Sequence, residues 1–479
     1  MRSLFSRRIT TGLCLLVVLA LSLTLLSVTR PAARASKASA SIALSKVTGP
    51  PTTTVTINGS GFGSSETVTA TFDTTTTLGT STTSSMGSFS LLIKIPSTAL
   101  PGQHPIQVTG HSSGFTVSRT FLVNTNWQQF GYDQSHSRTN PYENVLSRTT
   151  VSKLTLDWHY TAGSSIDSSP SIVNGVVYIG SDDHNVYALD ARTGTKLWSY
   201  TTGGQVYSSP AVANGVVYIG SEDHNVYALD ARTGTKLWSY YTPNSVYSFS
   251  SRAVANGVVY IGSDDNNMYA LDAKTGLKLW SYTTGSSIRS SPAIANGVVY
   301  IGSSDGNVYA LDAKTGTKLW SYHTGTSVYS SPAVTNGVVY IGSEDTNVYA
   351  LNAKTGLKLW SYTTGSSILF SSPAVANGVV YIGSYDNKVY ALDAKTGTKL
   401  WSYNTANWVW SSPAVANGVV YIGSENTNVY ALDAKTGTKL WSYTTGIGIS
   451  SSPAVANGVV YIGSGDYNVY AFHLPGTQP

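Results

Sequence analysis

The chain has 479 residues and a formal net charge of +5, and only 11% of its residues are charged. The first forty residues hold six Lys or Arg and no acid, so the remainder has a net charge of −1 and no electrostatic reason to bind nucleic acid or anionic lipid. At 41% hydrophobic residues, the chain is also too apolar for an intrinsically disordered protein.

Residues 1–40 have the layout of a secretory signal peptide, with Arg7 and Arg8 in a basic start and an apolar run over 13–28. The run is slightly short for a membrane span of about 20 residues, so an uncleaved anchor is the alternative and would be the only membrane contact. Cys14 is the only cysteine and lies in this leader, so the mature chain has no disulfide. We expect an exported protein that is extracellular, at the cell surface or periplasmic.

Residues 41–124 predict a small β-sandwich. Alternating runs at 54–57, 67–72 and 89–93 are separated by turns rich in Gly and Ser. The segment has the size of one immunoglobulin-like domain. Residues 125–150 form a polar, aromatic lead-in to the rest of the chain.

Residues 151–479 are dominated by near-identical repeats of about 40 residues. Each opens with a version of Ser-Ser-Pro-Ala-Val-Ala-Asn-Gly-Val-Val-Tyr-Ile-Gly-Ser, and the eight copies begin at 168, 208, 250, 290, 330, 371, 411 and 451. Within a copy, four short β-prone runs are separated by turns, among them the Asn-Gly dipeptide favoured in type I′ hairpins. Helical periodicity is missing. Each repeat therefore predicts one four-stranded propeller blade.

The last repeat ends soon after His473 and lacks a fourth strand. Residues 156–160, before the first repeat, align with the fourth strand at 197–200 through their tryptophans. Because an unpaired blade edge would be left exposed, we expect this N-terminal strand to complete the last blade. The predicted fold is all-β: an eight-bladed propeller of four-stranded blades with split-blade closure, preceded by the small sandwich. An open solenoid is the alternative.

The segment 188–198, Ala-Leu-Asp-Ala-Arg-Thr-Gly-Thr-Lys-Leu-Trp, resembles the tryptophan-docking motif of pyrroloquinoline-quinone-type propellers, and the lead-in 127–133 is similar to the segment that opens many of them. Residues 59–63 and 101–104 resemble an IPT/TIG-type immunoglobulin-like domain. The propeller resemblance implies that one indole per blade docks against the next blade, which agrees with the large apolar surface of a tryptophan at a fixed position. These structural tryptophans are Trp158, Trp198, Trp238, Trp280, Trp320, Trp360, Trp401 and Trp441.

The same resemblance raises a quinone-dependent dehydrogenase as an alternative. Such enzymes typically use an adjacent cysteine pair, blade insertions with a calcium-binding constellation and a catalytic aspartate, and the uniform repeats offer none of these. The Ser-x-Asp-x-Asn turns supply few carboxylates for a calcium site, and the histidines lack metal-ligand spacing. We predict no catalytic, cofactor-binding or metal-binding residues, and neither pyrroloquinoline quinone nor calcium. The family also includes non-catalytic scaffolds, among them an outer-membrane assembly lipoprotein.

The repeats differ from one another mainly in two loops, the connection from one blade to the next and the Ser-x-Asp-x-Asn turn. In a four-stranded meander both loops emerge on the same face, and loops on a rigid scaffold commonly carry function. Aromatic side chains and Arg are enriched in binding hot spots. The candidate binding face comprises Asp167, Tyr207, Tyr247, Phe249, Arg289, Tyr329, Phe370, Trp408 and Trp410. The alternative is that these side chains only fill the loop face and vary freely.

These observations predict an exported, monomeric, non-catalytic binding or scaffold protein, with the immunoglobulin-like domain as a spacer. We expect its partner to be a protein. A glycan that stacks on Trp408, Trp410 and the tyrosines is the alternative partner.

Overall fold

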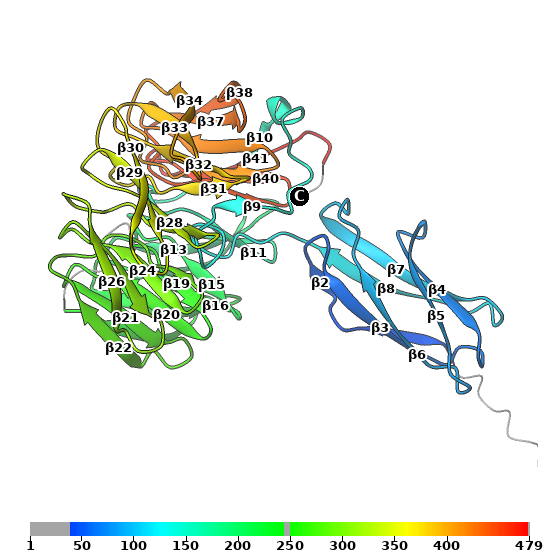
Figure 1. The fold of residues 1–479 in the computed structure, drawn as a ribbon. Coiled ribbons are helices and arrows are strands. Elements are labelled where there is room, and N and C mark those ends of the chain that lie inside the picture. Colours follow the sequence, from blue (N-terminus) through cyan, green and yellow to red (C-terminus); the bar gives the residue numbers. More distant parts are fainter. Residues whose placement is uncertain (1–38, 244–249, 478–479) are drawn as a thin grey trace, which may run out of the picture. The chain divides into compact units, whose positions relative to one another are not determined.

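The computed structural model describes residues 39–243 and 250–477, and its regular structure there is β apart from one 3-10 turn, η1 (Val151–Lys153) (Figure 1). Within these ranges no helix is long and apolar enough to cross a membrane. The predicted leader, with Cys14, lies outside the described residues except for Ser39 and Ala40. Two residues of the candidate binding face, Tyr247 and Phe249, also lie outside them.

Two sheets form the N-terminal sandwich, and their strands pair antiparallel except for β2 with β8. One has the order β1-β3-β6 and the other the order β2-β8-β7-β4-β5. Alternate residues of their strands are buried and form a core that includes Val55, Ile57, Val68, Ile106 and Phe121. This alternation confirms the predicted sandwich. The strands are β1 (Ser41–Leu44), β2 (Thr48–Gly49), β3 (Thr54–Ser60), β4 (Thr67–Phe72), β5 (Thr76–Thr82), β6 (Phe89–Lys94), β7 (Gly102–Gly110) and β8 (Thr116–Val123).

A buried carboxylate joins two loops of the sandwich. Glu66 is 3% exposed and accepts hydrogen bonds from the backbone N–H of Gly63, at 2.5 Å, and of Ser112 and Ser113, at 2.9 and 2.7 Å. The Ser113 hydroxyl donates a fourth, at 2.7 Å. Burial alone raises the pKa of Glu66, but these donors outweigh it and hold the pKa at about 2. The ionised form of this side chain therefore stabilises the fold.

Glu66→Gln should lower the free energy of unfolding by about 1–3 kcal/mol, because it replaces charge-assisted hydrogen bonds with neutral ones. The folded pKa lies below that of the unfolded chain, so the Glu66 contribution is present above about pH 4.5 and is lost as the pH falls toward 2. Urea unfolding of both proteins between pH 7 and pH 3 tests this, with Lys94→Gln, which removes an exposed charge on β6, as control. A difference between wild type and Glu66→Gln that stays constant down to pH 3 would contradict it.

Each blade is an antiparallel four-stranded meander. In the first blade the order is β11 (Ser171–Val173), β12 (Val176–Gly180), β13 (Asn185–Asp190) and β14 (Lys196–Thr201). The turn between β11 and β12 has Asn174 at φ 51° and Gly175 at φ 79°, the left-handed pair that a type I′ turn requires. The next six blades repeat this meander: β15–β18 (211–241), β19–β22 (253–283), β23–β26 (293–323), β27–β30 (333–363), β31–β34 (374–404) and β35–β38 (414–444). The last of these gains a fifth strand, β9 (Thr139–Asn140), which pairs parallel with β35.

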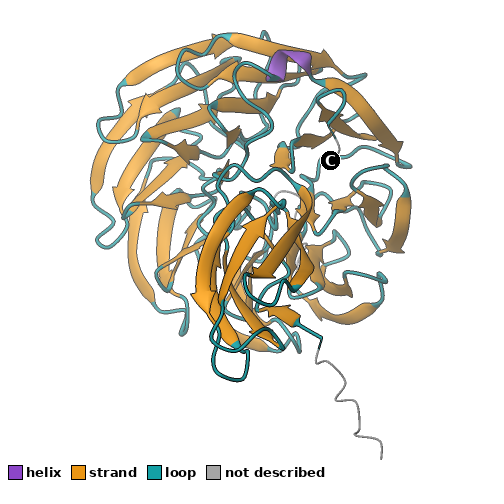
Figure 2. Ribbon diagram, turned by 90° about the vertical axis from the view of Figure 1, so that its right-hand side faces the viewer, coloured by secondary structure: helices purple, strands orange, loops and turns teal. Residues whose placement is uncertain are grey.

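The eighth blade confirms the predicted closure. Its sheet has the order β10-β41-β40-β39, in which β10 (Thr155–Thr161) supplies the strand missing after β39 (Ala454–Ala456), β40 (Val459–Gly463) and β41 (Asn468–His473). Trp158 pairs with Ala471 in the register that Trp198 has with Ala188. The inner strand of the first blade, β11, contacts β39 of the last as well as β15, so the sheets form a closed ring around a common axis (Figure 2).

Neighbouring blades are joined through tryptophan, tyrosine and glycine. In the contact between the third and fourth blades, the indole N–H of Trp280 and the hydroxyl of Tyr260 both donate to the carbonyl of Ala313, each at 3.0 Å. The Trp280 ring lies over Gly316, where a Cβ would come within 2.6 Å of it, and Gly316 also has φ 75°. The repeated glycine is therefore required twice, by its backbone and by the ring above it.

Seven of the eight indoles use an alanine carbonyl of the next blade in this way, and Trp441 uses the carbonyl of Leu154 ahead of β10.

Trp280→Ala should lower the free energy of unfolding by about 3–5 kcal/mol, because it leaves a cavity between two blades. The matched control is Leu279→Ala, the neighbouring side chain on the same strand, which is 53% exposed whereas Trp280 is 9% exposed. Urea unfolding followed by far-UV circular dichroism compares them. Equal losses in the two variants would show that the indole does not hold the blades together.

Candidate functional site

The lead-in contains a segment, residues 127–140, that runs along the innermost strands of the propeller; we call it the axial strap. The backbone N–H of the middle residue of seven inner strands donates to it, for example Ile172 to the Trp127 carbonyl at 2.8 Å and Val415 to the Arg138 carbonyl at 2.8 Å. On the eighth, the Asn140 side chain donates to the Val455 carbonyl at 2.9 Å. The other contacts join Val212, Val254, Ile294, Val334 and Val375 to Gln128, Gln129, Gln134, Ser135 and Ser137.

The strap therefore covers strand edges that have no neighbour within their own blade. The sequence indicated only a lead-in here, and this role was missed.

Side chains of the strap fill the axis. Phe130, His136 and Arg138 are all buried, and the Arg138 guanidinium lies 3.9 Å from the centre of the Phe130 ring. Burial, and then the neighbouring Arg138, lowers the pKa of His136 to about 3. Burial lowers the pKa of Arg138 to about 9, although Asp133 opposes this. At neutral pH the axis therefore holds a neutral imidazole and a cation over an aromatic ring.

A ring of serines surrounds the axis and closes the propeller. The second serine of each Ser-Ser pair donates its backbone N–H to the hydroxyl oxygen of the same serine in the next blade, at 2.8–3.3 Å. The last bond runs from Ser452 to Ser169. Eight bonds thus join eight blades, through Ser169, Ser209, Ser251, Ser291, Ser331, Ser372, Ser412 and Ser452.

A cavity of about 30 Å³ lies on the axis at the variable face; we call its opening the axial mouth. It brings together five of the candidate residues, Asp167, Tyr207, Tyr329, Phe370 and Trp410. Apart from the serine ring, two other residues line it that the sequence analysis missed, Phe130 and Ser450. Ser450 occupies the Asp167 position in the last blade, and Phe130 comes from the strap, so it could not be placed without the path of the strap.

The remaining described candidates lie beside the axial mouth. The Arg289 guanidinium is 5.6 Å from the centre of the Tyr329 ring and 3.2 Å from the Asp264 carboxylate. Trp408 belongs to a stack with Tyr385 and Trp410, in which ring centres are 5.0 to 6.1 Å apart. Trp408 is 47% exposed. Tyr385 was also missed, although it lies in the variable Ser-x-Asp-x-Asn turn.

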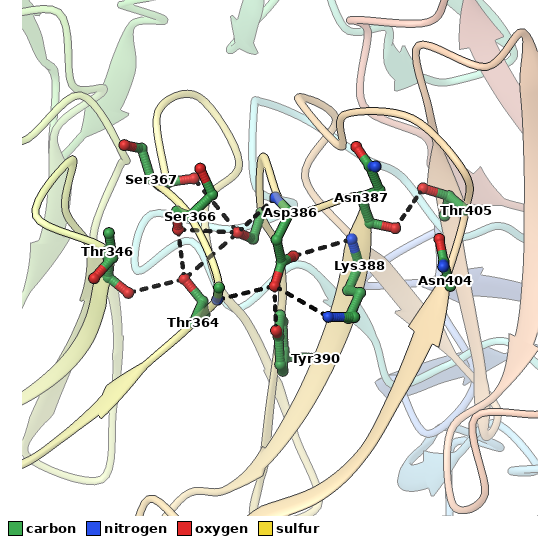
Figure 3. Close-up of polar contacts among 12 residues, drawn as sticks. Thr346, Thr364, Ser366, Ser367, Asp386, Asn387, Lys388, Tyr390, Asn404 and Thr405 are labelled. Atoms are coloured by element: carbon green, nitrogen blue, oxygen red, sulfur yellow. Dashed lines mark hydrogen bonds and ion pairs between the residues drawn. The ribbon is translucent and has the colours of Figure 1, made fainter.

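The two variable loops are tied to each other by an aspartate that most blades share. Figure 3 shows the sixth-blade example, in which Asp386 accepts hydrogen bonds from the hydroxyl of Tyr390 and from the N–H of Gly365, at 2.9 Å. Thr364 in the same connection donates to the carbonyls of Thr346, at 2.8 Å, and Ser366, at 2.6 Å. In this example the backbones of the two variable loops are therefore joined by hydrogen bonds.

Carboxylates surround the axial mouth. Burial raises the pKa of Asp167, and it raises the pKa of Asp182 to about 7 together with the neighbouring charges of Asp167, Glu222 and Asp183. Burial also raises the pKa of Glu425, and Asp167 adds to this shift. These groups destabilise one another's ionised forms, so a positive charge brought among them would be stabilised.

The axial cavity does not fit pyrroloquinoline quinone. Pockets for ligands of that size are about 300–1,000 Å³, at least about ten times the 30 Å³ enclosed here. Across residues 39–243 and 250–477 no group of three or more His, Cys, Asp or Glu side chains could hold a metal ion. A groove of about 720 Å³ on the opposite face is lined largely by repeated turns, such as Asn214-Gly215, and by strap amides such as Gln128.

Known protein families match both the sandwich and the propeller. An IPT/TIG domain model matches residues 42–123. A family model described as outer membrane protein assembly factor BamB matches residues 144–255, 247–368, 324–408 and 364–476. A curated relative, 1-butanol dehydrogenase (cytochrome c) of Thauera butanivorans, is 31% identical over 80 residues, which are 16% of this chain and 11% of that protein. The match thus spans a small part of the dehydrogenase.

Solved structures share the fold at low sequence identity. The quinohemoprotein alcohol dehydrogenase of Comamonas testosteroni has a TM-score of 0.65 at 17% identity and is matched over 74% of this chain and 81% of its own. BamB of Moraxella catarrhalis has a TM-score of 0.59 at 21% identity, over 67% of this chain and 99% of its own. Enzymes and BamB are thus both among the structural neighbours.

With four overlapping matches over residues 144–476, on a ring of eight tryptophan-docked blades, this chain belongs to the family of pyrroloquinoline-quinone-type propeller repeats described as outer membrane protein assembly factor BamB, and it carries an IPT/TIG domain at its N-terminal side.

Proposed function

We propose that this protein is an exported, non-catalytic scaffold that binds a partner protein through the variable face of its propeller. The predicted leader would export it, and the IPT/TIG domain would act as a spacer. One observation carries the proposal: near-identical blades differ chiefly at the side chains that surround the axial mouth.

The contrast between the two faces supports this. On the opposite face all eight blades keep the same Asn-Gly turn. At the position before the serine pair, the described blades instead carry an acid, a cation and several aromatic side chains, namely Asp167, Tyr207, Arg289, Tyr329, Phe370, Trp410 and Ser450. Binding hot spots are enriched in Trp, Tyr and Arg, and loops on a rigid scaffold are the usual place for them.

The form of the axial mouth favours contacts with a macromolecule over chemistry on a small one. A cavity of about 30 Å³ holds only one or two water-sized groups, so it would take the tip of a side chain and not a whole substrate. The exposed Trp408 ring, backed by Tyr385, offers a flat apolar surface beside it. That surface is also what favours a glycan as the second candidate partner, through ring stacking.

Trp408→Ala should abolish or strongly weaken partner capture, since exposed interface tryptophans commonly contribute 2 kcal/mol or more, roughly thirtyfold in affinity. The full-length protein is immobilised, incubated with envelope proteins and, separately, with an array of glycans, and recovery is quantified. Leu400→Ala is the matched control, because Leu400 is a large apolar side chain of similar exposure, 51%, on the outer strand β34 (Lys399–Asn404), next to the repeated turn at 393–397 and away from the variable loops. Equal recovery with wild type, Trp408→Ala and Leu400→Ala would contradict a role for this face.

Titration of the full-length protein with pyrroloquinoline quinone and calcium should show no stoichiometric uptake, because the axial cavity is too small for the quinone and the larger groove on the opposite face is lined largely by repeated turns. Absorbance of the bound quinone and a dye-linked assay of alcohol oxidation provide the two measurements. Uptake with turnover would show that the chain is a dehydrogenase and would overturn the scaffold proposal.

A further inference from the structure

The walls of the axial mouth combine aromatic faces with a carboxylate. Tyr207, Tyr329, Phe370 and Trp410 line the cavity together with Asp167. The faces of aromatic rings carry partial negative charge, and they attract ammonium and guanidinium groups most strongly where water is excluded. Asp167 and the ring faces would therefore attract a cation, while the Trp410 indole N–H, which is buried and has no acceptor among the described residues, could donate to an acceptor beside it.

Acids outnumber bases at the positions that surround the axial mouth. Two positions in each blade are counted: the residue before the serine pair, such as Asp167, and the residue after the serine that follows the second strand, such as Asp182. The fifteen described positions supply one base, Arg289, which is paired with Asp264. They supply six acids: Asp167, Asp182, Glu222, Asp264, Glu344 and Glu425. An excess of acids at one place attracts positive charge.

Two contacts bear on what these acids would bind. Arg289 already places a guanidinium over the Tyr329 ring and against Asp264, so the same kind of lining accommodates a cation within the molecule.

The size of the cavity limits which cationic groups could bind in it. About 30 Å³ holds one or two water-sized groups, which suits a primary ammonium. A trimethylated ammonium, with three methyl groups in place of three N–H donors, is larger and cannot hydrogen-bond to a carboxylate.

We propose that the axial mouth binds the ε-ammonium of a lysine side chain on the partner protein, with Asp167 as its carboxylate partner and Tyr207, Tyr329, Phe370 and Trp410 as the surrounding rings. This inference rests on the proposed binding function of the variable face. The lysine would act as the central anchor of the interface, while Trp408 and the outer loops contact the surface around it.

The test uses the full-length protein labelled with 5-fluorotryptophan, whose Trp410 signal is assigned by Trp410→Phe. Three acetylated and amidated pentapeptides, Gly-Gly-Lys-Gly-Gly and its acetyl-lysine and trimethyl-lysine forms, serve as probes. We expect the lysine peptide to shift the Trp410 fluorine signal in a saturable and salt-sensitive manner. The acetyl-lysine and trimethyl-lysine peptides should bind at least about tenfold more weakly, because each loses charge-assisted hydrogen bonds or exceeds the cavity.

Asp167→Asn and Phe370→Leu should each weaken the lysine peptide by about tenfold, while the exposed outer-strand control Asp157→Asn leaves it unchanged. Near-UV circular dichroism checks that each variant is folded, and the two independent variants keep the test valid if one of them is not. Equal binding of all three peptides, or of lysine peptide to wild type and both variants, would overturn the lysine site.

The two experiments together distinguish failure of the lysine site from failure of the proposed binding function. No response to any peptide, together with partner capture that Trp408→Ala abolishes, would overturn the lysine anchor and leave the binding face standing. No response to any peptide and no effect of Trp408→Ala would overturn both.

Discussion

The contact of one indole with one glycine between neighbouring blades is the constraint on which the propeller depends. Trp280 lies on Gly316 and shares the Ala313 carbonyl with Tyr260, and the same geometry recurs around the ring. Since the glycine has no Cβ, the ring approaches the backbone closely, and the angle between blades is set by the same atoms each time. A repeat that adds a constant rotation at every step closes only at a fixed number of blades, which here is eight.

Closure creates a second requirement, at the axis. Every inner strand has one paired edge and one edge that faces the centre, where unpaired backbone groups would be costly. The serine ring and the axial strap meet this requirement between them, from the two ends of the inner strands. Phe130 and Arg138 then occupy the space that remains. The propeller is therefore closed at its centre, and what it presents at the variable face is a shallow mouth rather than an open channel.

This arrangement explains how the same fold can occur both in an alcohol dehydrogenase and in BamB. The blade contacts lie between sheets, and the residues that differ among blades lie in loops that bear little of the packing. In this chain hydrogen bonds such as the one from the Gly365 N–H to Asp386 join the two variable loops of a blade, and buried side chains of the strap fill the axis. Side chains at the axial mouth therefore differ from blade to blade, while the contacts between blades stay the same.

The sequence by itself determined the number of blades, the strand order within each blade, the split closure and the family. These follow from local signals, such as the Asn174-Gly175 turn, and from the spacing of tryptophans that a repeat displays directly. It also indicated which face varies. It could not determine the path of residues 127–140, because the strap has no periodicity and bonds to strands up to 315 residues away.

Only the tertiary structure decided which variable side chains act together. Trp408 and Trp410 are two residues apart in one loop, yet Trp410 lines the cavity and Trp408 is 47% exposed. Tyr385 and Phe130 join them from other segments of the chain. The physical reason is that a loop side chain takes its place from the blades and the strap packed around it, and these neighbours are distant in sequence and adjacent only after the ring has closed.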